Sequence, residues 1–195
     1  MTIPARVYRR LAAASLMLML AACGGSQTAS SGSPPANVAN GVVIGLTDAP
    51  GNFATYRVDV TAVTLTGADG TAVQALPART RVDFAQYAQV TELLSAAAVP
   101  AGAYTAVTMT LDYSNADIRV ADARGNTVQV TTIQDDSGAP LTTLQVPVLM
   151  TGGALTVTAK VTRHMTLDFD LQASNAVNAG PPATMTVAPV LLADV

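Results

Sequence analysis

The sequence predicts an all-β protein: a Greek-key β-sandwich of about nine strands, either immunoglobulin-like or transthyretin-like. Apolar residues alternate with polar ones, Thr above all, through most of residues 41–195, which is typical of strands with one buried face. Amphipathic helix is scarce, since only Ala85–Ala98 could form a helical turn or two. With 195 residues, of which 50% are apolar and 12% charged, the chain suits one domain with a sizeable core.

Each strand is predicted from its own alternation. Within Tyr56–Leu65 the apolar positions change parity, which indicates a β-bulge near Thr61–Ala62. A hairpin turn is expected at Ala123–Asn126. Another turn at Lys160–His164 should divide Leu155–Leu171, because that alternation is too long for one strand. The remaining strands are expected at Val42–Leu46, Arg79–Phe84, Tyr104–Tyr113, Asp117–Ala121, Thr127–Thr131, Leu144–Val148 and Met185–Leu191.

The first 22 residues have the pattern of a lipoprotein signal peptide. Three arginines form a positive n-region, and the apolar stretch Leu11–Ala22 is too short to span a bilayer. It ends in Leu20-Ala21-Ala22-Cys23, which resembles the bacterial lipobox, where the cysteine is diacylated and the preceding peptide is removed. We therefore expect Cys23 to be a lipid anchor, with an ordinary signal peptide as the alternative. By the same resemblance, Gly24 favours the outer membrane of a Gram-negative cell.

Residues 23–40 are predicted to be the lipidated cysteine and a disordered tether, because they are rich in Gly, Ser, Pro and Ala. Residues 41–195 are then a single β-sandwich domain. Without the three N-terminal arginines the net charge of −3 becomes −6, which excludes the basic surface of a nucleic-acid-binding protein. One Cys and one His, His164, exclude a disulfide scaffold, a thiolate zinc site and a multi-histidine metal centre.

The segment Pro100-Ala101-Gly102-Ala103-Tyr104 resembles the tyrosine corner of Greek-key proteins. In that motif the phenol binds the backbone a few residues upstream and fixes the arch between two sheets. We therefore expect Gly102 and Tyr104 to have structural roles.

Three segments together resemble a bacterial lipoprotein family known as domain of unknown function 4382. They are Thr47-Asp48-Ala49-Pro50-Gly51, the Pro-Ala-Gly-x-Tyr turn, and Asp168-Phe169-Asp170. The resemblance covers roughly Gly41–Leu192 and departs from the family pattern at Lys160–His164. It implies a surface-anchored β-sandwich of unknown role, with no established catalytic residues.

Asp48, Asp168 and Asp170 are the weak candidates for a metal site. Pro50 and Gly51 fit the second and third positions of a type II turn that Asp48 would cap. Asp168 and Asp170 would project from one face of a strand, where a solvated surface is the preferred explanation and a ligand set is the alternative. The sharper hypothesis is a Ca²⁺ site that uses these carboxylates; otherwise no cofactor is expected.

Catalysis has little support in the sequence. His164 is predicted to be a surface residue in a turn, and no serine lies in a Gly-x-Ser-x-Gly motif. We therefore expect a non-catalytic envelope lipoprotein, held to the membrane by its lipid, that binds or scaffolds an envelope protein or glycan. The alternative is an Asp-based or metal-dependent hydrolase acting at the cell envelope.

Overall fold

The computed structural model describes residues 40–48, 51–88 and 90–195. Thirteen strands make up most of this part, so the predicted all-β class is confirmed, although the prediction of about nine strands was too low. The predicted tether, with its lipid attachment site Cys23, and the turn residue Pro50 lie outside the described residues. None of the helices formed by the described residues has the length and apolarity that a membrane crossing requires.

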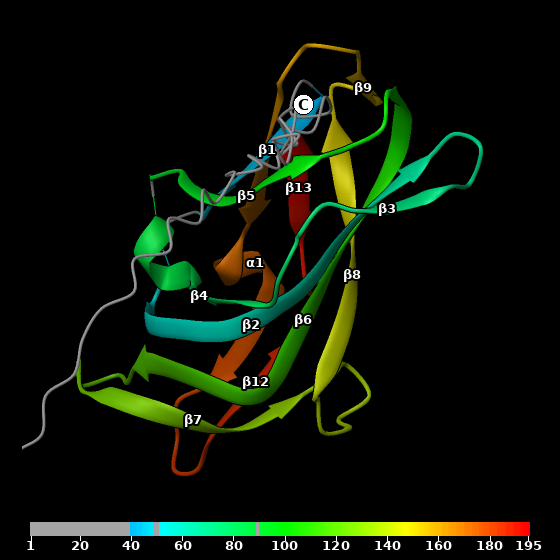
Figure 1. The fold of residues 1–195 in the computed structure, drawn as a ribbon. Helices are drawn as coiled ribbons and strands as arrows, with labels where there is room; N and C mark the ends of the chain where they lie inside the picture. Colours follow the sequence, from blue (N-terminus) through cyan, green and yellow to red (C-terminus); the bar gives the residue numbers. More distant parts are fainter. Residues whose placement is uncertain (1–39, 49–50, 89) are drawn as a thin grey trace, which may run out of the picture. The chain divides into compact units, whose positions relative to one another are not determined.

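The first layer is built on two long strands, β2 (Phe53–Gly67) and β6 (Gly102–Ala121), which pair antiparallel along nearly their whole lengths (Figure 1). Two short strands extend the free edge of β2, and three others pair in succession with the opposite edge of β6. These flanking strands are β3 (Ala72–Gln74), β4 (Thr80–Asp83), β7 (Thr127–Gln134), β8 (Thr143–Thr151) and β9 (Leu155–Val157).

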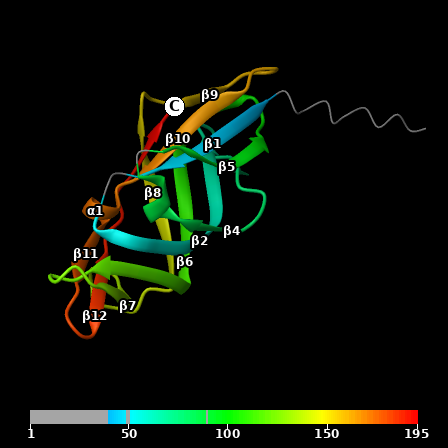
Figure 2. The same ribbon diagram turned by 90° about the vertical axis from the view of Figure 1, so that its left-hand side faces the viewer.

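The second layer has the strand order β5-β1-β10-β13-β8. Figure 2 shows β1 and β10 side by side in this layer, where they pair in parallel. Strand β8 belongs to both layers, because its first part pairs with β6 and its last residues pair with β13. The new strands are β1 (Gly41–Thr47), β5 (Glu92–Ala98), β10 (Arg163–Phe169) and β13 (Leu191–Asp194).

A smaller extension of the sheet continues from β7, which pairs with β6 through its first residues and with β12 through its last. Two single-turn helices interrupt the strands, one after β4 and one after β10. Three strand pairings in the described part are parallel, β1–β10, β7–β12 and β8–β13, so the sheet is mixed rather than purely antiparallel. The remaining elements are η1 (Phe84–Tyr87), α1 (Leu171–Ser174), β11 (Asn175–Asn178) and β12 (Ala183–Val187).

The two layers face each other across one apolar core. Tyr56 of β2 packs edge-to-face on Phe169 of β10, with the ring centroids 5.8 Å apart. Phe84 packs in the same way on Phe169 at 5.0 Å, and all three rings are fully buried. Burial of such large rings, together with their edge-to-face geometry, makes this aromatic cluster a major source of stability.

Most predicted strand features are present. The parity change in β2 coincides with a register shift between Val60 and Ala62, so the predicted bulge is confirmed. The hairpin at Ala123–Asn126 also forms, with the Asp122 carbonyl accepting from the Gly125 amide at 2.9 Å. The expected strands Tyr104–Tyr113 and Asp117–Ala121 are, however, one long strand, β6.

The one helical turn expected at Ala85–Ala98 forms as η1, at the start of that segment, and strand β5 follows it because pairing with β1 overrides the helix propensity of its alanines. Two local predictions were wrong. The turn before β10 ends earlier than expected, so His164 lies in the strand, where it is exposed. The last predicted strand is two strands, β12 and β13, which pair with β7 and β8.

Two tyrosines make a hydrogen-bonded chain inside the core. The hydroxyls of Tyr56 and Tyr113 lie 3.1 Å apart, and Tyr56 donates to the Asn175 side-chain oxygen at 3.1 Å. Asn175 in turn donates to the Leu171 carbonyl at 2.8 Å. Burial raises the pKa of both tyrosines, that of Tyr56 also because Tyr113 lies beside it.

We expect the free energy of unfolding to fall as the pH rises above about 10, the pKa of tyrosine in an unfolded chain. The folded state holds both protons beyond that pH, so each tyrosine should remove about 1.4 kcal/mol of stability per pH unit until its folded pKa is reached. Urea denaturation between pH 8 and pH 11 measures this slope. A Tyr56→Phe, Tyr113→Phe double variant should lose most of it, and an unchanged slope in that variant would contradict the assignment.

Candidate functional site

The predicted tyrosine corner is present. The Tyr104 hydroxyl donates to the Pro100 carbonyl at 2.9 Å, four residues upstream, as the motif requires. Gly102 does not need to be glycine, however, because a Cβ there would meet nothing within 4 Å. Gly51 directly follows Ala49 and Pro50, which lie outside the described residues, so the type II turn predicted at this position stays a prediction.

The three candidate metal ligands lie in neighbouring segments, but their carboxylates make different contacts. Asp48 is buried, and its Oδ1 accepts from the Leu171 amide at 3.0 Å. Asp170 is the N-cap of α1 and accepts from the Ala173 amide at 2.8 Å. Among the described residues, no three His, Cys, Asp or Glu side chains are grouped closely enough to hold a metal ion. Calcium binding therefore stays a prediction, without a ligand cluster to support it.

Asp168 differs from the other two. It lies in β10 opposite Thr47, and its Oδ1 is buried without a hydrogen-bond partner among the described residues. Burial raises its pKa, and the neighbouring Asp170 raises it further. None of the six ion pairs in the described part of the chain brings a cation to this carboxylate.

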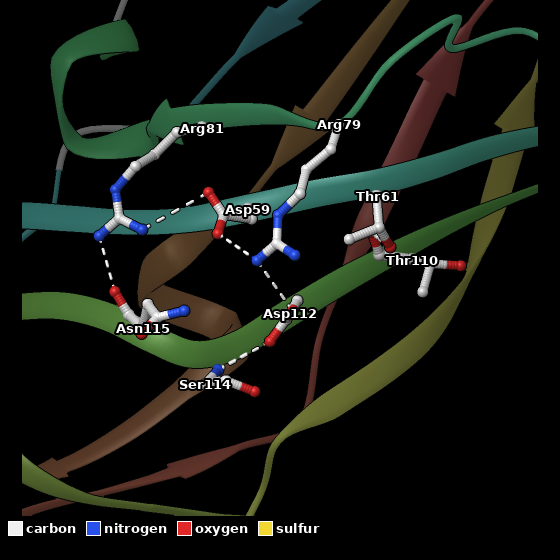
Figure 3. Close-up of polar contacts among 8 residues, drawn as sticks. All are labelled: Asp59, Thr61, Arg79, Arg81, Thr110, Asp112, Ser114 and Asn115. Carbon is white, nitrogen blue, oxygen red and sulfur yellow. Dashed lines mark hydrogen bonds and ion pairs between the residues drawn. The ribbon is translucent and has the colours of Figure 1, made fainter.

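A second polar site, which the sequence interpretation missed, lies on the outer surface of the first layer. Figure 3 shows Arg79 and Arg81 reaching from the β4 side of the sheet towards carboxylates on β2 and β6. Their neighbours continue the pattern, so that four arginines alternate with four aspartates across three strands. We call this set the charged face: Arg57, Asp59, Arg79, Arg81, Asp83, Asp112, Asp117 and Arg119.

Strand alternation explains why these charges lie outside. In β2, Tyr56, Val58 and Val60 point into the core, so Arg57 and Asp59 between them point to the opposite face. The register then places Asp59 opposite both Arg81 of β4 and Asp112 of β6. Two like charges facing each other across strands need a cation between them, and Arg79 provides it.

The central contacts of the charged face converge on Arg79. Its Nη2 donates to Asp59 Oδ2 at 2.5 Å and to Asp112 Oδ2 at 2.9 Å. The hydrogen bond to Asp59 raises the pKa of Arg79. Asp112 also accepts from Ser114 at 2.8 Å, and this hydrogen bond, with Arg79 nearby, lowers the pKa of Asp112.

The outer contacts extend the network in both directions. Arg81 donates to Asp59 at 3.5 Å and to the Asn115 carbonyl at 2.7 Å. Arg57 lies 3.0 Å from Asp83 and 3.4 Å from Asp117. Arg119 donates to Asp117 at 3.0 Å, which lowers the pKa of that carboxyl.

The arginine side chains are more exposed to solvent than the aspartate side chains with which they pair. The four arginine side chains are 42–52% exposed, whereas the four carboxylates are only 9–27% exposed. Each guanidinium has five N–H donors, and Arg79 uses only its Nη2 in the contacts with described residues. The charged face therefore presents anchored guanidinium groups with free donors to whatever approaches it.

Uncharged rows continue the same surface. Thr64 of β2 is paired with Gln74 on one side and Thr108 on the other, and Pro147 follows on β8. In the next row Thr110 is paired with Gln145. These side chains are half-buried or exposed, and the threonine hydroxyls can both donate and accept. We call this neighbouring area the threonine rows.

The sequence contains a signal for the charged face. Charges recur at every second position in Arg57-x-Asp59, Arg79-x-Arg81-x-Asp83 and Asp117-x-Arg119, which is the period of a strand. The partners are far apart in the chain, however, since Arg79 and Asp112 are 33 positions apart. Only the strand register shows that these runs meet.

Comparison with known proteins identifies the family. No curated protein and no solved structure matches the chain. Residues 41–185 match the model of the family described as "Domain of unknown function (DUF4382)". The matched range includes all three segments that carried the sequence resemblance. It begins with β1 and ends within β12. Because the match covers well over half of its residues, the chain belongs to the DUF4382 family.

Proposed function

We propose that this chain is a non-catalytic envelope lipoprotein, held to the outer membrane through Cys23, that binds a partner with its charged face. The observation that carries the binding role is the arrangement of half-exposed arginines over nearly buried aspartates. Removing carboxylates from water is unfavourable unless they are paired, and a β-sheet does not need charges at these positions. A recognition surface gives such pairs a role.

The side chains favour an envelope protein as the partner. Arginine is enriched in protein interfaces, and its planar group donates two parallel hydrogen bonds to a carboxylate. The threonine rows add hydroxyls beside the charged face. Sugars commonly stack on aromatic rings, and the described residues of these two areas include none. A glycan partner is thus the less favoured choice.

The lipid anchor supports this role from the other end of the chain. Residues 24–40 contain 17 positions rich in Gly, Ser and Pro, for which a flexible linker has an r.m.s. reach of about 20–25 Å. A tether of that reach would keep the domain close to the membrane and raise its effective concentration near other envelope proteins.

The hydrolase hypothesis retains one supporting observation. The raised pKa of Asp168 is a property that a general acid needs. A general acid also needs a second catalytic group and a pocket for the substrate. Neither Asp168 nor Asp170 lines any of the five best-formed pockets on the surface of the described residues. The binding module is therefore the function that we favour.

Arg119→Gln and Arg57→Gln should each reduce recovery of the partner about tenfold, the effect of losing an arginine hot spot. The measurement is affinity purification of the tagged, full-length lipoprotein from its own envelope, followed by quantitative mass spectrometry. Arg124→Gln is the matched control, because Arg124 is exposed in the β6–β7 turn and takes no part in the charged face. Equal recovery of the same proteins with all three variants would overturn the proposal.

A further inference from the structure

We infer that the turn between β9 and β10 is a contact surface for anionic phospholipid headgroups, and that it orients the domain on the membrane that anchors it. This inference rests on the proposed lipid anchor. The contact surface consists of the turn Thr158–Thr162 and the first two residues of β10, Arg163 and His164, and all of these residues are exposed. It contains Lys160 and Arg163, with Val161, which is 41% exposed, between them.

The topology places this turn beside the point where the tether reaches the domain. Strands β1 and β10 are parallel, so both begin at the same end of the layer, and Val42 is paired with Arg163. The Lys160 amide donates to the side chain of Asn40 at 2.9 Å. Thr162 lies against Gly41, where a Cβ would be 3.6 Å from its hydroxyl. The contact surface is therefore next to the end of the chain that leads to the membrane.

The charge distribution is asymmetric. The chain without its three N-terminal arginines has a net charge of −6, and four of its seven cations belong to the charged face. Lys160 and Arg163 take part in none of the six ion pairs of the described residues. Two cations without a counter-ion among the described residues, separated by an exposed apolar side chain, fit a surface of lipid phosphates with an apolar boundary beneath.

The backbone provides an independent observation. Lys160 has a φ of 64°, and it is the one non-glycine residue with positive φ in the described part of the chain. Glycine adopts this conformation without strain, whereas a residue with a Cβ does not. Folding alone would therefore favour glycine at the tip of this turn. A lysine there is explained if its charge has a function that compensates for the strain.

Nearby acidic groups do not neutralise the turn. Asp194 of β13 is paired with Thr166, three residues beyond Arg163 along β10. Glu92 and His164 line one shallow pocket of about 210 Å³ on the outer side of β1, together with Gly45. The side chain of Arg163 is held in place by a hydrogen bond that its Nε donates to the Thr156 carbonyl at 3.0 Å. This leaves both terminal nitrogens of the guanidinium group free to bind a phosphate.

The test uses the mature lipidated protein, reconstituted in vesicles of phosphatidylcholine alone or with 30 mol% phosphatidylglycerol. A fluorophore on Thr162→Cys reports energy transfer to a headgroup-labelled lipid, and the same fluorophore on Ala123→Cys is the distant control. Each cation near an anionic surface should shift the ratio of docked to undocked protein about fivefold, and the two together about 30-fold. Transfer should therefore rise on the anionic vesicles at the turn and fall again in 0.5 M NaCl.

Three variants separate lipid contact from stability. Lys160→Glu and Arg163→Glu should each weaken docking, whereas Arg124→Glu, with the same change in charge, should not. Lys160→Gly is the sharpest variant, because it should relieve the backbone strain and keep or raise the melting temperature while it weakens docking. Equal transfer on neutral and anionic vesicles, or normal docking of Lys160→Gly, would overturn the inference. Flotation with vesicles reports the lipid anchor separately, so a protein that floats but does not dock contradicts only this inference.

Discussion

Cys23→Ser is expected to move the protein from the membrane fraction to the soluble fraction almost completely and to leave the signal peptide uncut. The cysteine sulfur is the atom that would carry the diacylglycerol, and serine cannot form the thioether. Two or three acyl chains bury enough CH₂ groups, at about 0.8 kcal/mol each, to make anchoring stable. None of the helices of the described residues could cross a membrane in their place.

Membrane fractionation and intact mass spectrometry measure this prediction together. The wild-type product should begin at Cys23 and carry the mass of its acyl groups. Gly25→Ser, two residues further along, is the control and should be processed like the wild type. A Cys23→Ser product that stays membrane-bound with an identical N-terminus would show that another feature holds the chain.

Phe169→Ala is expected to cost about 3–5 kcal/mol, the usual loss for removing a buried phenylalanine from a core. Phe169 is fully buried, and its ring contacts those of both Tyr56 and Phe84 edge-to-face. It therefore joins the two layers at the point where β10 leads into α1. Since a domain has only about 5–15 kcal/mol of stability, this variant should be close to unfolding.

Urea denaturation at neutral pH tests the prediction, with Phe169→Leu as the matched control. Leucine keeps most of the buried volume, so its cost should stay below about 1.5 kcal/mol. If alanine and leucine had equally small effects, the aromatic cluster would not be the centre of the core. Membrane association of both variants should remain, because the proposed lipid anchor, Cys23, lies elsewhere in the chain.

Local alternation made the strands of the two layers predictable. The core positions of β1, Val42, Ile44 and Leu46, follow from a strict period of two, and the bulge in β2 follows from its change of parity. Strand β5 was hidden because alanines and leucines fill most of it and favour helix in isolation. Its one buried polar residue, Ser95, donates to the Ala75 carbonyl at 2.6 Å, a contact that only the folded chain provides.

The candidate sites were predictable to different degrees. The hydrogen bond of Tyr104 is local in sequence, so its motif was sufficient to predict it. Asp48, by contrast, binds the amide of Leu171, 123 residues away, and no local pattern contains that information. The charged face lies between these cases, since its charges alternate visibly while their pairing depends on the register of β2, β4 and β6.

The most direct test of the account is photo-crosslinking in intact cells. A photoreactive residue is placed at Gln145, which is exposed within the threonine rows, or at Thr132, which is exposed on β7. If the charged face and its surroundings form the binding surface, Gln145 should give one discrete adduct with an envelope protein, and Thr132 should give none. A discrete adduct from Thr132 alone would contradict this assignment and place the partner on another surface.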